Sequence, residues 1–103
     1  MATGKTPLVV SGALERLGAD LSTWRKLRRL TVAEIADRAG LGVSTVLRLE
    51  NGHGASLENA LRVARALGVL ELMAGSVDPY LTEVGQLRAD ESLPRRVRSR
   101  AAT

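Results

Sequence analysis

The sequence predicts an all-α fold of five helices in one small domain. Hydrophobic residues make up 45% of the 103 residues, and with one Trp, one Tyr and no Phe they are mostly Leu, Val and Ala. Such a composition favours packed helices over a sheet. Apolar residues recur every three or four positions along several segments, which is the period of an amphipathic helix. Glycines stand where these segments end, at Gly40, Gly52 and Gly68, as is typical of helix C-termini.

The first predicted helix runs from Ser11, which suits an N-cap, to about Arg29. Residues 1–10 lack helical periodicity and contain Gly4 and Pro7, so we expect them to form a flexible N-terminal arm. Within the helix, apolar residues at three- and four-residue intervals share one face, namely Leu14, Leu17, Leu21, Trp24 and Leu27. Basic residues gather at its C-terminal end, where the helix dipole favours cations, namely Arg25, Lys26, Arg28 and Arg29.

Two short helices are predicted next. Thr31 and Glu34 have the spacing of a capping box, in which the threonine caps the first turn and the glutamate reaches back. Ile35, Ala36 and Ala39 then form an apolar stripe that stops at a glycine.

The second short helix covers residues 43–51, with Val46 and Leu49 facing inward and Asn51-Gly52 at its end. Two short helices joined by a tight glycine-containing turn, here over residues 31–52, are a helix-turn-helix. The second helix of such a motif usually reads the DNA major groove.

A fourth helix is predicted between Ser56, its cap, and Gly68. Its inward residues are Leu57, Leu61, Ala64 and Leu67. The apolar run over residues 69–74 completes the core as a fifth helix, forms a subunit interface, or does both. The candidate interface residues are Val69, Leu70, Leu72 and Met73.

These elements predict a domain over residues 11–76 and a largely disordered C-terminal extension over residues 77–103. Asp78-Pro79 interrupts the helical pattern. Tyr80 to Leu93 is expected to form a weak helix or to dock on a partner, and the basic tail from residue 92 to be disordered.

Composition excludes several classes of function. The chain has no cysteine, which rules out disulfides and thiolate metal sites and suits a reducing cytoplasm. No apolar run approaches membrane-spanning length. His53 is the only histidine and has neither a metal-binding neighbour nor a base partner, so we expect no metal, no cofactor and no enzymatic activity. A net charge of +4 is compatible with a polyanionic partner.

Residues 31–52 resemble the XRE family, the phage-repressor-like (Cro/CI-type) helix-turn-helix proteins. The resemblance spans Leu14 to Met73. It rests on the capping Thr31 with Glu34 and on seven short motifs. These are Ile35-Ala36, Ala39-Gly40, Ser44-Thr45-Val46, Arg48-Leu49-Glu50, Asn51-Gly52, Ser56-Leu57-Glu58 and LRVARALG at 61–68. It implies a five-helix lambda-repressor-like domain. It also implies a transcription regulator that binds double-stranded DNA as a homodimer.

Two further hypotheses follow from the rest of the sequence. The helical extension, Asp78-Pro79 and the polar tail are similar to HipB-type antitoxins, which implies operator DNA and a kinase-like toxin as partners. Alternatively, the family usually has a glutamine at the position of Val32 and often has polar residues at the positions of Val43 and Leu47. These departures favour a protein-interaction module that no longer reads DNA.

The resemblance assigns roles to individual residues. Val43, Ser44, Leu47 and Arg48 would face base edges, with Arg48 gripping guanine or clamping a phosphate. Thr45 and Asn51 are candidates for phosphate oxygens, as are Thr31 and Val32 at the start of the second helix.

Three flanking residues, Lys26, Arg28 and Arg29, either contact phosphates or form a solvated helix end. Arg29 replaces the glycine common at that position in the family. The resemblance also implies a partly buried ion pair between Arg25 and Glu50, which ties the first helix to the third.

Overall fold

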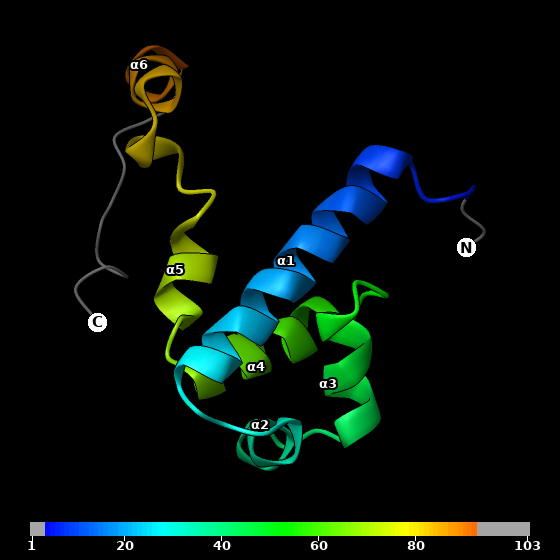
Figure 1. Ribbon diagram of the computed structural model, residues 1–103. Coiled ribbons are helices and arrows are strands. Elements are labelled where there is room, and N and C mark those ends of the chain that lie inside the picture. Colours follow the sequence, from blue (N-terminus) through cyan, green and yellow to red (C-terminus); the bar gives the residue numbers. More distant parts are fainter. Residues whose placement is uncertain (1–3, 93–103) are drawn as a thin grey trace.

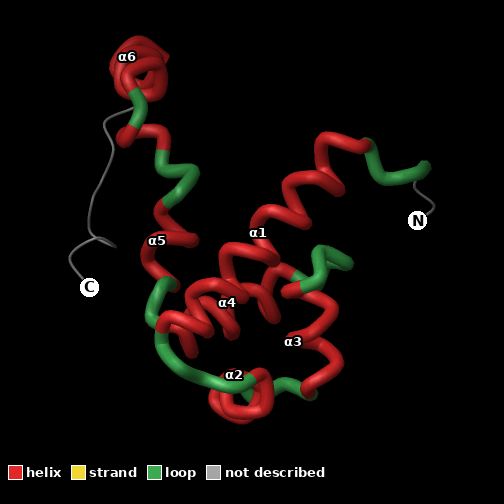
Figure 2. The backbone as a smooth tube through the Cα atoms, in the orientation of Figure 1, coloured by secondary structure: helices red, strands yellow, loops and turns green. Residues whose placement is uncertain are grey.

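The computed structural model describes residues 4–92, and these residues form helices joined by short turns (Figures 1 and 2). The elements in chain order are α1 (Leu8–Leu27), α2 (Val32–Ala39), α3 (Val43–Glu50), α4 (Leu57–Leu67), α5 (Leu70–Gly75), the 3₁₀ helix η1 (Pro79–Leu81) and α6 (Glu83–Ser92). The predicted all-α fold is confirmed. Within the described part, no helix combines the length and hydrophobicity needed to cross a membrane.

The core lies where α1 to α4 converge, and Val69 closes it from the start of α5. Its largest fully buried side chains are Ile35 of α2, Val46 of α3, and Val63 and Leu67 of α4. Each of these residues lies on the apolar stripe of its own helix. Burial of these stripes therefore sets the packing of the domain.

Helix α1 begins at Leu8, so the predicted start at Ser11 is wrong. Pro7 takes the N-cap position, and its carbonyl oxygen accepts hydrogen bonds from the backbone N–H groups of Val10 and Ser11. The Ser11 hydroxyl donates to the carbonyl oxygen of Leu8 instead of capping the helix. Periodicity could not reveal this turn because Leu8 is 88% exposed and lies outside the core cluster of the described residues.

Three residues predicted on the apolar faces are exposed, and one of them, Leu17, is only marginally so at 36%. Leu27 is 69% exposed and Leu57 is 73% exposed. Leu27 is the last residue of α1 and Leu57 the first residue of α4, so both stand where the chain leaves or enters the core.

Four helices end in the same hydrogen-bonded motif. After α1, the N–H of Leu30 donates to the carbonyl of Arg25 and that of Arg29 to Lys26, which is the Schellman pattern. Helices α2, α3 and α4 end in the same way, with a left-handed glycine one or two residues beyond each helix, namely Gly40, Gly52 and Gly68. At α1 this residue is Arg29, with φ 58°, the one non-glycine with positive φ in the described chain.

Gly18 brings α1 close to the end of α3. A Cβ atom at this position would lie 2.8 Å from the carbonyl oxygen of Glu50 and still closer to that of Leu49. Both obstacles are backbone atoms, which cannot rotate away. The two helices can therefore pack at this distance only if residue 18 has no side chain.

The extension after α5 contains η1 and α6, and α6 lies within the segment from Tyr80 to Leu93 where a weak helix was one of the two predictions. The backbone N–H of Tyr80 donates to the Asp78 carboxylate, and that of Gly85 donates to the Thr82 hydroxyl. These local caps, which composition alone does not reveal, start the two helices. Helix α6 packs against η1 and stands apart from the body formed by α1 to α4 (Figure 1). Disorder was predicted from Ser92 onward, but Ser92 is the last residue of α6; residues 93–103 lie outside the described part of the chain.

Replacing Gly18 with alanine should destabilise the domain, because the new methyl group would meet the carbonyl oxygens of α3. We expect the free energy of unfolding to fall by roughly 1–3 kcal/mol, as is typical of overpacking. Gly12→Ala in the same helix is the matched control, since its Cβ would meet only the end of the Arg16 side chain at 3.9 Å. This control should raise stability by about 0.5–1 kcal/mol in urea denaturation. Equal effects of the two substitutions would contradict the close approach.

Arg29→Gly should stabilise the domain, because glycine adopts the left-handed conformation without the cost of about 1–2 kcal/mol that other residues incur. The greater entropy of glycine in the unfolded chain offsets part of this gain. We therefore expect a small rise in Tm by circular dichroism. A fall in Tm would show that the Arg29 side chain contributes more than its backbone strain costs.

Candidate nucleic-acid interface

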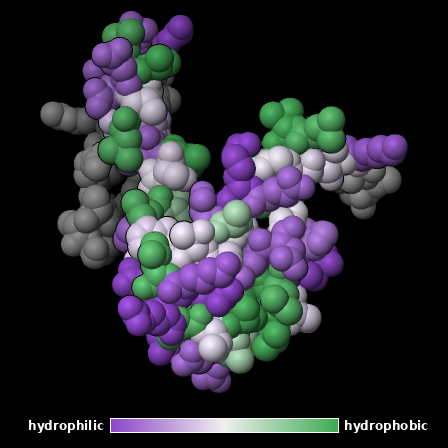
Figure 3. Space-filling model, in the orientation of Figure 1, coloured by the Kyte–Doolittle hydropathy of each residue, from purple (hydrophilic) through white to green (hydrophobic). Residues whose placement is uncertain are grey.

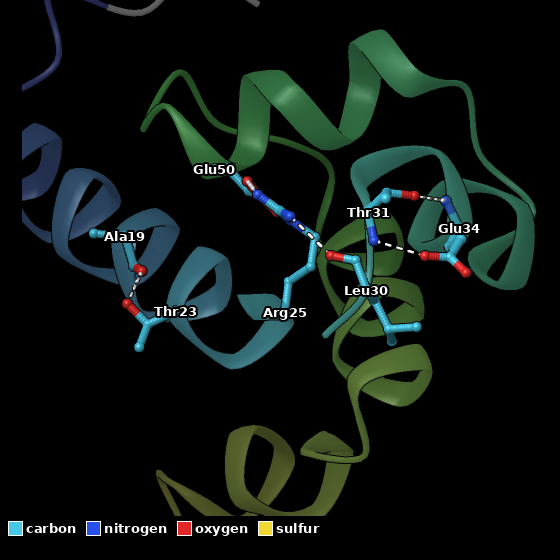
Figure 4. A network of polar contacts seen from close by, with 7 residues as sticks. All are labelled: Ala19, Thr23, Arg25, Leu30, Thr31, Glu34 and Glu50. Atoms are coloured by element: carbon cyan, nitrogen blue, oxygen red, sulfur yellow. Dashed lines mark hydrogen bonds and ion pairs between the residues drawn. The ribbon is translucent and has the colours of Figure 1, made fainter. Parts of the chain in front are cut away.

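The start of α2 is held by a complete capping box (Figure 4). The backbone N–H of Glu34 donates to the Thr31 hydroxyl at 3.1 Å, and that of Thr31 donates to the Glu34 carboxylate at 2.8 Å. The backbone hydrogen bond from Thr31, followed by the one from its side chain, holds the pKa of Glu34 below its ordinary value. Thr31 was predicted to contact DNA, and its side chain here serves the cap.

The predicted ion pair between Arg25 and Glu50 is confirmed. Arg25 Nε lies 2.7 Å from Glu50 Oε2, and its Nη2 lies 3.1 Å from Oε1, so the contact is bidentate. The side chains are 14% and 7% exposed. The hydrogen bond to Glu50 raises the pKa of Arg25 above its ordinary value.

Arg25 also reaches the turn that precedes α2, since its Nη1 donates to the carbonyl oxygen of Leu30 at 2.9 Å. Figure 4 shows the guanidinium between Glu50 and Leu30. One side chain therefore joins α1, the end of α3 and the α1–α2 turn. This network fixes the direction of α3 relative to the rest of the domain.

Helix α3 has one buried and one exposed face. Val46 is fully buried and Leu49 is 3% exposed. The outer residues are exposed, namely Val43, Ser44, Leu47, Arg48 and Asn51. Thr45 is half-buried at the margin. Glu50 is the only carboxylate of α3, and because it pairs with Arg25 its charge is neutralised at the inner side.

The outer face of α3 lies at the edge of the molecule (Figure 1). Figure 3 shows hydrophobic surface in this region beside hydrophilic surface. The face is thus accessible to a partner and free of acidic groups from its own helix. It brings together five of the predicted DNA-contacting residues, those named above as outer residues.

Arg48 lies toward the C-terminal end of this face. Its Nη2 donates to the carbonyl oxygen of His53 at 3.3 Å, which holds the guanidinium near the α3–α4 turn. The contact is single, long and exposed, so a phosphate or a guanine edge can replace it at small cost.

The remaining predicted contacts are more dispersed. Val32 is half-buried and packs against the core, so it offers no hydrogen bond to a phosphate. The Arg28 guanidinium lies 5.5 Å from the centre of the Trp24 ring, next to Gly68 at the end of α4. Lys26 and Arg29 are exposed at the end of α1. Val32 and Arg28 are therefore engaged within the domain, whereas Lys26 and Arg29 remain exposed to solvent.

Val69 is 5% exposed within the core of its own chain, so it cannot lie at a subunit interface as predicted. Leu70 and Met73 are half-buried, and Leu72 is 66% exposed. A groove of about 240 Å³ separates α1 from α5 next to Leu72.

Two contributions to this interface were missed in the sequence. Gly42 caps α3 without a side-chain hydrogen bond, which leaves the first backbone N–H groups of α3 available to an anion. Arg62 of α4 donates to the carbonyl oxygen of Ala39 and so links α4 to the end of α2. The absence of a polar residue at position 42 could have revealed the first. The second depends on tertiary packing and had no local signal.

Arg25→Ala should destabilise the domain, because it leaves the Glu50 carboxylate buried without a partner. We expect a loss of about 3–5 kcal/mol in the free energy of unfolding, measured by urea denaturation. The double variant Arg25→Met/Glu50→Leu removes both charges and should recover a large part of this loss. Equal stability of Arg25→Ala and the wild-type protein would contradict the orienting role of the pair.

A family model described as helix-turn-helix matches residues 21–71, from the middle of α1 into α5. Neither a curated protein nor a solved structure shows significant similarity to the chain. The matched region contains the capping box, the left-handed turn at Gly40, the exposed face of α3 and the Arg25–Glu50 pair. The chain therefore belongs to the XRE-type helix-turn-helix family, a family of Cro- and CI-like DNA-binding transcription regulators.

Proposed function

We propose that this protein is a sequence-specific, repressor-like regulator that reads the DNA major groove with α3 as a homodimer. The observation that carries the proposal is the asymmetry of α3. Its inner face is fixed by Val46, Leu49 and the Arg25–Glu50 pair, while its outer face is exposed and without carboxylates. A helix that is rigidly held and open on one side suits insertion between two phosphate backbones.

The polar side chains of α3 and its C-cap have different roles in the proposed binding, some contacting bases and others phosphates. Ser44, the second residue of α3, can donate to or accept from a base edge. Arg48 can exchange its contact with His53 for guanine O6 and N7 or for a phosphate. Thr45 and Asn51 are assigned to phosphate oxygens, which position the helix without reading sequence.

Cations outside α3 contribute attraction rather than selectivity. Lys26 and Arg29 are exposed, and the chain carries a net charge of +4. Binding should therefore weaken steeply as salt concentration rises, because each neutralised phosphate releases counterions. Arg28 contributes less, since it lies over Trp24.

A homodimer follows from the small number of hydrogen-bonding groups on α3. One half-site offers Ser44 and Arg48 as the main base-reading donors, so two half-sites about one helical turn apart are needed for useful selectivity. Leu72, with Leu70 and Met73 beside it, supplies the candidate interface on α5. An exposed leucine next to a groove is a suitable anchor for such a contact.

The second candidate function is that of an antitoxin that binds both operator DNA and a kinase-like toxin. Helix α6 favours it, because α6 stands away from the body and, together with η1, exposes apolar side chains. Leu81, Val84 and Leu87 are 73%, 68% and 60% exposed. A toxin encoded in the neighbouring reading frame, co-purifying with this chain, would support this function, and a solitary gene would count against it.

Arg48→Ala should weaken binding to the preferred duplex, chosen from a random DNA pool, about 5- to 150-fold, the range for losing one bidentate base contact. Fluorescence anisotropy at fixed salt measures this Kd. Arg88→Ala on α6 is the matched control, because it removes the same charge far from α3 and should leave Kd within twofold. Equal weakening by both substitutions would mean that net charge, and not the α3 face, governs binding.

A further inference from the structure

Two apolar side chains project from the outer face of α3. Val43 is 44% exposed and Leu47 is 42% exposed, although the apolar positions needed for the core are already filled by Val46 and Leu49. Val43 and Leu47 are four residues apart, so they are neighbours on the helix surface. Neither contributes to the buried core cluster. Their exposure therefore has no structural role within the described chain.

The chemistry of the major groove restricts what such side chains can contact. Base edges there present hydrogen-bond donors and acceptors and a single apolar group, the 5-methyl group of thymine. An apolar side chain over a polar edge displaces water and leaves donors or acceptors unsatisfied, which costs free energy. Over a 5-methyl group, the same side chain buries apolar surface and gains free energy.

We propose that Val43 and Leu47 form a methyl-reading pair, which selects half-sites carrying 5-methylpyrimidines. The ligand is thymine or 5-methylcytosine, since both place the same methyl group in the groove. The proposal rests on the proposed function, because it requires α3 to enter the major groove. It adds the chemical class of the bases at two positions of each half-site.

The geometry of α3 sets the spacing of the two methyl groups. Side chains four residues apart are separated by about one helical turn, a rise of roughly 5.4–6 Å. Successive base pairs are separated by about 3.4 Å. The two methylated pyrimidines should accordingly lie one or two base steps apart. Ser44 lies between the two side chains in sequence and can add a hydrogen bond at the same steps.

Two random duplex pools distinguish the two sources of the methyl group. In one pool thymine is the only methylated base, and in the other deoxyuridine replaces thymine and 5-methylcytosine replaces cytosine. The full-length protein selects its preferred duplex from each pool. The pool that yields the tighter duplex identifies the methylated base that α3 prefers.

The methyl groups of the preferred duplex are then removed one position at a time, with deoxyuridine for thymine or cytosine for 5-methylcytosine. This change keeps every hydrogen-bonding group of the base edge. At one or two positions per half-site, Kd of the wild-type protein should rise about fourfold, the value expected for one buried methyl group.

Side-chain variants connect each methyl group to its reader. With Val43→Ala or Leu47→Ala, one of these positions should lose its sensitivity to methyl removal. Both side chains are exposed, so the variants should fold, and circular dichroism checks this. Leu8→Ala at the start of α1 is the control, since it truncates an exposed leucine outside α3 and outside the candidate dimer interface, and it should keep the fourfold effect.

The outcomes separate this inference from the proposed function. If the protein binds a selected duplex but no methyl removal changes Kd by more than twofold, the inference is wrong and DNA binding stands. The same holds if the methyl effects persist unchanged in both α3 variants. If neither pool yields a bound duplex, both the proposed function and the inference are wrong, and the apolar α3 face is then assigned to a protein partner.

Discussion

The ion pair between Arg25 and Glu50 is the contact on which the rest of the domain depends. Its bidentate geometry joins α1 to the end of α3, and a third hydrogen bond extends it to Leu30 before α2. A buried charge pair adds little net stability compared with apolar residues of the same size, but it tolerates few arrangements. The pair therefore contributes mainly to the orientation of α3, since it determines which face of α3 is exposed to solvent.

Gly18 complements this electrostatic contact with a steric one. The backbone of α1 lies directly against the carbonyl groups of Leu49 and Glu50, and two turns later Arg25 reaches the Glu50 side chain. The same two turns of α1 thus hold both the main chain and the side chain at the end of α3. Because the contacts at Gly18 and Arg25 lie two turns apart along α1, together they prevent α3 from tilting or sliding, which a single contact would allow.

Local features of this domain could be predicted from the sequence, while long-range ones could not. The capping box of Thr31 and Glu34 and the left-handed Gly40 and Gly68 follow from short-range chemistry, and the structure contains them. The Arg25–Glu50 pair was available only through the family resemblance, because nothing local relates residues 25 apart. Gly18 and the burial of Val69 depend on which helices meet, so composition and periodicity could not distinguish them from ordinary helix residues. The roles of Ser44 and Arg48 in reading DNA remain predictions.

The isolation of α6 has a thermodynamic consequence for any protein that binds there. A ten-residue helix whose main packing partner within residues 4–92 is η1 has little intrinsic stability, since isolated helices of this length are marginal in water. A partner that binds Leu81, Val84 and Leu87 must also keep α6 helical. The entropy lost in ordering the helix offsets part of the favourable enthalpy of association. Such a complex would form with modest affinity for its contact area and dissociate readily, as suits a reversible regulatory interaction.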